Sequence, residues 1–157
     1  MAELLPQARS PELRERVSEL ALLVQRLCDH RAQLTGASAA EVDAVTAPVA
    51  PLVDLIAAQV RVVVSIDAEL AGLDEGAMVR ALAASEARRE PAARREPLLT
   101  GLDRLRTLED QRSTAMQRLL EASSLLRRAV SLGLNRGGDE HTQAAELALA
   151  LASLEPG

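Results

Sequence analysis

The residues that could perform nucleophilic or metal chemistry are few. The single cysteine, Cys28, and one of two histidines, His30, flank Asp29. On a helix, side chains two residues apart point to different sides, so this spacing does not favour a metal site. A cysteine beside a leucine is most often a small core residue. His141, the second histidine, follows a predicted helix cap, where we expect it to be solvated.

Acidic side chains form one group that could hold Mg²⁺. Glu12, Glu15 and Glu19 share a face of the first predicted helix, but Arg14 and Arg16 are interspersed among them. No second inward-facing acidic pair of this kind accompanies the group. A solvated helix surface is therefore the favoured interpretation over a metal site.

A glycine-rich stretch and an arginine cluster are the two candidates for anion binding. Residues 133–138, GLNRGG, lack the following Lys-Ser/Thr and the preceding strand of a phosphate-binding loop. The arginines belong to a tandem repeat, EARREP at 86–91 and AARREP at 92–97, where they alternate with glutamates. The prolines that end both copies favour a solvated bend over an anion site. The sequence thus predicts no enzyme, no metal and no cofactor.

Composition limits the fold and the classes of partner. The chain has 157 residues, one cysteine, no Phe, Tyr or Trp, and a formal charge of −5. Its length suits a single domain over 1–157, and its aliphatic composition favours helices over sheets. The negative charge and the lack of stacking aromatics argue against nucleic-acid binding. No signal peptide or membrane span is predicted, and a lone cysteine fits the cytoplasm.

The predicted central helix extends from Val42 to Leu73. Its apolar residues recur at steps of three and four, which keeps one stripe facing partner helices over many turns. Only Gln59 interrupts the stripe. Pro48 and Pro51 should each remove a backbone hydrogen bond, so we expect a kink or short break near 47–51 with the two halves roughly collinear. The stripe comprises Val42, Val45, Val49, Leu52, Ile56, Gln59, Val63, Ile66, Leu70 and Leu73.

Other helices follow from cap and turn signals. The first should begin at Ser10-Pro11 and end at Gly36, and the capping-box spacing from Ser38 should start the central helix near Ala39. Asp74 should cap a helix over 75–89, and later helices should cover 98–132 and 140–153. Residues 1–9 are predicted to be a loose N-terminus and 133–138 a linker before the short C-terminal helix. The predicted fold is an all-α antiparallel bundle of four to five helices with one long, proline-kinked central helix.

The stretch from Leu70 to Arg112, about a quarter of the chain, carries a recognisable pattern of a helix, a short Gly-Asp break and a second helix. Its residues are Gly72, Leu73, Asp74, Met78, Leu82, Glu86, Leu98, Leu99, Leu102, Leu105, Leu108, Glu109 and Arg112. This pattern resembles the central hairpin of FlgN-type flagellar export chaperones, although the proline-bearing repeat and the prolines at 48 and 51 depart from it. The resemblance implies a cytoplasmic, non-enzymatic chaperone of long antiparallel helices that holds the terminal segments of hook-associated subunits until export.

The predicted C-terminal helix supplies the candidate partner-binding residues. Leu147, Leu151 and Leu154 form an amphipathic stripe after the glycine-rich linker. A weakly docked helix of this kind can lift away and present its stripe to an amphipathic client helix. The predicted function is therefore a helical protein-binding module. The alternative is a structural or self-associating bundle whose apolar stripes pair between chains.

Overall fold

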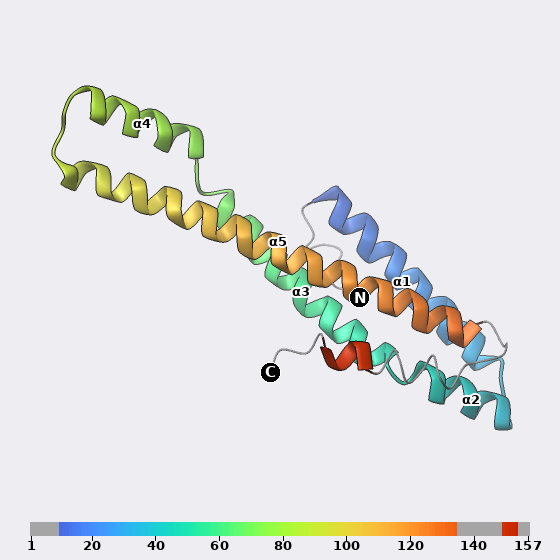
Figure 1. Cartoon of the computed structure of the whole chain (residues 1–157). Helices are drawn as coiled ribbons and strands as arrows, with labels where there is room; N and C mark the ends of the chain where they lie inside the picture. Colours follow the sequence, from blue (N-terminus) through green and yellow to red (C-terminus); the bar gives the residue numbers. More distant parts are fainter. Residues whose placement is uncertain (1–9, 135–148, 154–157) are drawn as a thin grey trace. The chain divides into compact units, whose positions relative to one another are not determined.

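A computed structural model describes residues 10–134 and 149–153, and within these ranges the chain is helical with no strand. The all-α class is confirmed. The first three helices are α1 (Pro11–Ala32), α2 (Gly36–Thr46) and α3 (Val49–Leu70), followed by α4 (Glu75–Ala87) and α5 (Ala92–Leu134) (Figure 1). A further helical segment occupies 149–153. The predicted loose N-terminus, 1–9, lies outside the described residues.

The described helices form two compact units. Unit 1 holds the described residues up to Arg61 and from Met116 onward, and unit 2 holds Val62–Ala115. Both α3 and α5 contribute residues to each unit.

Unit 1 is built around aliphatic stripes on three segments. The fully buried side chains include Leu13, Val17 and Leu20 of α1, Leu52, Ile56 and Val60 of α3, and Leu119 and Leu126 of α5. Arg127 of α5 pairs with Glu19 of α1 at 2.7 Å, and Leu27 lies against Gly133 further along. Since both contacts advance in the same direction, α1 and the C-terminal part of α5 run parallel, as Figure 1 shows.

Unit 2 contains the end of α3, all of α4 and the start of α5. Two ion pairs connect α3 to α5, Asp67 with Arg112 and Glu69 with Arg104, each at 2.6 Å. Val63, Ile66, Leu105 and Leu108 supply buried aliphatic side chains. By contrast, the one buried residue of α4 is Ser85. Figure 1 shows α4 beside the start of α5. The side chains of α4 bury little apolar surface there, since its one buried residue is polar.

Several helix boundaries differ from those expected. α1 ends at Ala32 and Gly36 begins α2, so the predicted end at Gly36 and start at Ala39 are wrong. Gly36 adopts φ +61°, a conformation open to glycine at little cost, which lets the chain reverse between the two helices. Thr35, not Ser38, is the N-cap residue of α2.

The helix break before α3 falls at the first proline. α2 stops at Thr46, residues 47 and 48 form a turn, and α3 starts at Val49. Pro48 has no N–H to continue the ladder of α2, whereas Pro51 lies in the first turn of α3, where an N–H has no helical partner. Leu52 N–H donates to the Pro48 carbonyl at 3.1 Å. The helical hydrogen bonds of α3 therefore begin with the Pro48 carbonyl, directly after the break.

The start and end of α5 both extend past their predicted limits. The helix begins at Ala92 rather than near Leu98, and Pro97 lies inside it. Good helix formers between the two prolines outweigh the one hydrogen bond that Pro97 removes. At the other end, Gly133 and Leu134 of the predicted linker are helical residues of α5, and 135–138 lie outside the described residues.

Candidate protein-binding surfaces

Of the predicted partner-binding residues, Leu151 is described, and Leu147 and Leu154 lie outside the described residues. Leu151 is half-buried in the helical segment 149–153, while its neighbour Leu149 is 73% exposed. The segment therefore presents apolar surface both to the protein and to solvent.

The segment 149–153 lies against α5 at an open pocket of about 320 Å³. Glu121, Ser124 and Leu125 of α5 line one side, and Ala150 and Ser153 line the other. The side chains at 150 and 153 are small, so they bury little area at this contact.

A second open pocket, which we call the hairpin groove, lies between α4 and the start of α5. It measures about 390 Å³ and is lined by Leu82 and Glu86 of α4 and by Ala92, Arg95, Glu96 and Leu99 of α5. Leu82 is half-buried and Leu99 is 49% exposed. The groove thus combines incompletely covered aliphatic side chains with charged ones.

Sequence reasoning missed the hairpin groove. Leu82 and Leu99 entered the sequence analysis only as residues of the family resemblance, because periodicity identifies an apolar face without showing whether another helix covers it. One signal was present: the apolar face of the 75–89 helix is thin. A thin face predicts shallow packing against a neighbouring helix.

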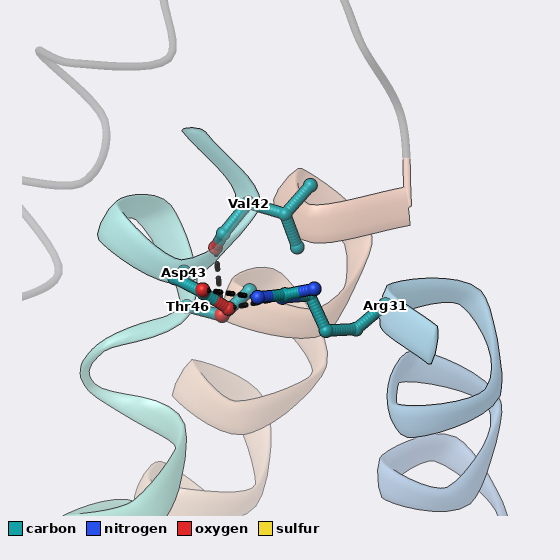
Figure 2. Close-up of polar contacts among 4 residues, drawn as sticks. All are labelled: Arg31, Val42, Asp43 and Thr46. Carbon is teal, nitrogen blue, oxygen red and sulfur yellow. Dashed lines mark hydrogen bonds and ion pairs between the residues drawn. The ribbon is translucent and has the colours of Figure 1, made fainter. Parts of the chain in front are cut away.

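The clearest polar contact in unit 1 joins α1 to α2 (Figure 2). Arg31 donates from Nε to Asp43 Oδ1 at 2.5 Å and from Nη2 to Oδ2 at 2.6 Å. This two-bond geometry matches the guanidinium fork to the carboxylate. The hydrogen bond from Arg31 lowers the pKa of Asp43 below its ordinary value and raises the pKa of Arg31. Both side chains are well exposed, so the pair acts as a clasp between helices rather than a reactive centre.

The candidate reactive residues are not brought together. Cys28 is exposed. The Nε2 atom of His30 is buried without a hydrogen-bond partner. Glu19 pairs with Arg127, and Glu12 and Glu15 are exposed on α1. Within residues 10–134 and 149–153, no group of three or more His, Cys, Asp or Glu side chains could hold a metal ion. His141 lies outside the described residues.

The arginine cluster lies at the turn between α4 and α5. Glu90 is shared between Arg88 at 3.6 Å and Arg94 at 3.8 Å. Arg89 adopts φ +51° and is exposed, so the bend lies at residues 88–91. The second copy of the repeat, AARREP at 92–97, is helical, and the predicted bend is wrong there. Arg95 differs from Arg88 and Arg94, because its Nε atom is buried and has no hydrogen-bond partner.

One stretch of the described residues, Ser38–Leu70, is long and apolar enough to cross a membrane by length and composition. This is weak evidence, because a core helix of a soluble protein satisfies the same criteria. Buried residues recur along the stretch at Val42, Val45, Leu52, Ile56 and Val63.

The chain was compared with protein-family models, curated proteins and solved structures. No family model, no curated protein and no solved structure matches the chain.

Proposed function

We propose that this chain is a non-enzymatic protein-binding module of the cytoplasm, an antiparallel helical bundle that holds an amphipathic helix of a client subunit. A chaperone of flagellar or type III export, as implied by the FlgN-type resemblance, is the specific form of this proposal. It binds neither nucleic acid nor membrane and uses no cofactor. The segment 149–153 carries the proposal.

The contact of this segment with α5 supports exchange. Ala150 and Ser153 face the pocket over Glu121, Ser124 and Leu125, Leu151 is half-buried, and Leu149 is mostly exposed. An amphipathic client helix with larger apolar side chains would fill the pocket of about 320 Å³ better than these small residues do. In this mechanism the C-terminal stripe, Leu147, Leu151 and Leu154, releases α5 or joins the client in a shared apolar contact.

The test replaces Leu147, Leu151 and Leu154 together with Ser in the full chain. The helical circular-dichroism signal and the melting temperature of the bundle should stay close to those of the wild type. Binding of a peptide from the terminal segment of a hook-associated subunit should be lost, as measured by isothermal titration calorimetry. Leu22→Ser serves as the control, because Leu22 is 62% exposed on α1 and should leave binding unchanged. Unfolding of the triple variant would instead place these leucines in the core and refute the proposal.

Self-association is the second candidate function. Exposed Leu22 on α1 and Leu120 on α5 favour it, since both could be covered by a second chain. The long apolar stripe weighs against it, because Leu52, Ile56 and Val63 are already buried within the chain. Multi-angle light scattering separates the two candidates: a monomer favours the client-binding module, and a tight dimer favours self-association.

A further inference from the structure

The tandem repeat of unit 2 adopts two conformations. The residues ARREP occur at 87–91 and again at 93–97. In the first copy, residues 88–91 lie outside any helix and form the turn that joins α4 to α5 (Figure 1). The second copy lies wholly within α5. One short sequence is therefore present in this chain both as a turn and as a helix.

The first arginine of each copy is equally accessible. The side chain of Arg88 is 73% exposed, and that of Arg94, the matching residue, is 74% exposed. Both reach Glu90 at more than 3.5 Å, and surface ion pairs of this kind contribute little. The second arginines differ, since Arg89 is exposed and Arg95 is half-buried.

The backbone distinguishes the two copies more sharply. A protease binds its substrate as an extended chain, and exposed turns are the preferred sites of cleavage in folded proteins. Residues 88–91 have no helix to unwind. Arg89 also adopts φ +51°, which is unfavourable for any residue but glycine, so opening the turn relieves strain. Cleavage at the second copy requires the start of α5 to unwind first.

We propose that the turn between α4 and α5 is a processing site for a protease of trypsin type, which recognises arginine through an acidic pocket. Hydrolysis breaks the peptide bond after Arg88 or Arg89. The hydroxyl of a water molecule joins the carbonyl carbon of that arginine, and a proton passes to the nitrogen of the next residue. Water is the only co-reactant. The matching bonds after Arg94 and Arg95 remain intact.

A single cut at this turn frees α4 from α5. The helix α4 has 13 residues and one buried residue, the polar Ser85. Isolated helices of this length are marginal in water, so α4 unwinds once one of its ends is cut. It then uncovers the face of α5 that contains Gly101, which lies against Met78, and Arg95, which lines the hairpin groove. Half-buried Leu98 lies between these two on the same face.

The two fragments stay associated after the cut. The core of unit 1 draws fully buried side chains from both of them: Leu13 and Leu52 precede the turn, and Leu119 and Leu126 follow it. The cut therefore acts as a switch confined to the hairpin. It uses none of the residues of the C-terminal stripe, so its failure and that of the proposed function are separate results.

Limited digestion of the full chain with trypsin tests the site. Intact-mass spectrometry gives the initial rates at which fragments appear. N-terminal fragments that end at Arg88 or Arg89 should form about tenfold faster than those that end at Arg94 or Arg95. This ratio is equivalent to about 1.4 kcal/mol for opening the start of α5. Equal rates at the two copies would overturn the inference.

Two matched variants check that the turn itself is recognised. R88Q/R89Q should abolish cleavage in the hairpin during the time that cuts the wild type to completion. R94Q/R95Q makes the same changes in the helical copy and should leave the rate at the turn unchanged. Rapid cleavage of R88Q/R89Q after Arg94 or Arg95 would show that the helical copy is equally open, against the proposal.

Hydrogen exchange of the cut chain tests the release of α4. Amides within 75–87 should lose their protection, while those within 119–130 keep it. Trypsin should next cut after Arg80, which is exposed on α4. The two fragments should elute together in gel filtration. Unchanged protection within 75–87, or separation of the fragments, would contradict a switch confined to the hairpin.

Discussion

A methyl group on Gly133 of α5 would lie 2.5 Å from the Cγ2 atom of Thr46 on α2. Thr46 cannot easily turn this methyl away, because its hydroxyl donates to the Val42 carbonyl at 2.7 Å. Figure 2 shows that bond beside the clasp formed by Arg31 and Asp43. The close approach of α5 to α2 therefore depends on glycine at position 133.

Gly133→Ala should destabilise unit 1 by about 1 kcal/mol. The gain in helix propensity, about 1 kcal/mol, is outweighed by an overpacking cost of about 1–3 kcal/mol. Urea denaturation followed by circular dichroism measures the difference. Thr46→Ser removes Cγ2, so the double variant G133A/T46S should recover part of the loss. No coupling between the two substitutions would contradict the assigned contact.

Gly101→Ala is the matched comparison in unit 2. The added methyl would lie 2.7 Å from Met78 Sδ, near the end of a flexible side chain. Methionine can move aside, so G101A should cost less than G133A or even stabilise the chain. A larger loss for G101A than for G133A would show that Met78 is more tightly held than its half-buried position indicates.

Asp43→Asn should lower the melting temperature at neutral pH, and the difference should disappear in acid. The pKa of Asp43 is lowered in the folded chain, so the unfolded chain takes up the proton first as the pH falls. The contribution is therefore present above the unfolded value, about 4, and is lost as the pH falls through the folded value. Melting curves of wild type and D43N at pH 7 and in strong acid test this. A constant difference across that range would exclude the ion pair as its source.

Asp74→Ala should destabilise the start of α4 by about 1 kcal/mol. Asp74 Oδ1 accepts from the Ala77 N–H at 2.8 Å and satisfies one of the free donors of the first turn. Because α4 has little apolar cover, the loss should appear as faster amide exchange within 75–87 rather than as global unfolding. Asp74→Asn retains a capping oxygen and should behave close to the wild type.

Leu126→Ala should cost about 2–5 kcal/mol, since Leu126 is fully buried and its removal leaves a cavity. Leu120→Ala on the same helix should change stability by no more than about 0.5 kcal/mol, because that side chain is 44% exposed. Chemical denaturation of both variants compares them directly. Similar losses would mean that Leu120 is covered in solution, as a self-associating chain would require.

Apolar periodicity was sufficient to predict the helical class and much of the core. Leu52, Ile56 and Val63 of the predicted central stripe are buried in α3. The predicted cap at Asp74 is confirmed by its bond to Ala77. These features follow from local rules, since side-chain spacing and cap geometry involve residues within one or two turns.

Features set by distant contacts were not predictable in this way. Gly133 was assigned to a linker, yet it packs against Thr46 and Leu27 from other helices. The hairpin groove exists because α4 leaves Leu99 of α5 partly exposed. The residue pattern within α5 alone cannot show how much of Leu99 a neighbouring helix covers. Pro97 was taken to delay a helix that in fact begins five residues before it.

The turn between α4 and α5 offers a place to label the protein. Arg88 and Arg89 are exposed there, and Arg89 already adopts a backbone conformation that is unfavourable for its type. An insertion at this tip would disturb few contacts. Because the sequence has no Trp, Tyr or Phe, a single fluorophore or tryptophan placed at the tip would emit against a dark background and report optically on events at that end of the hairpin.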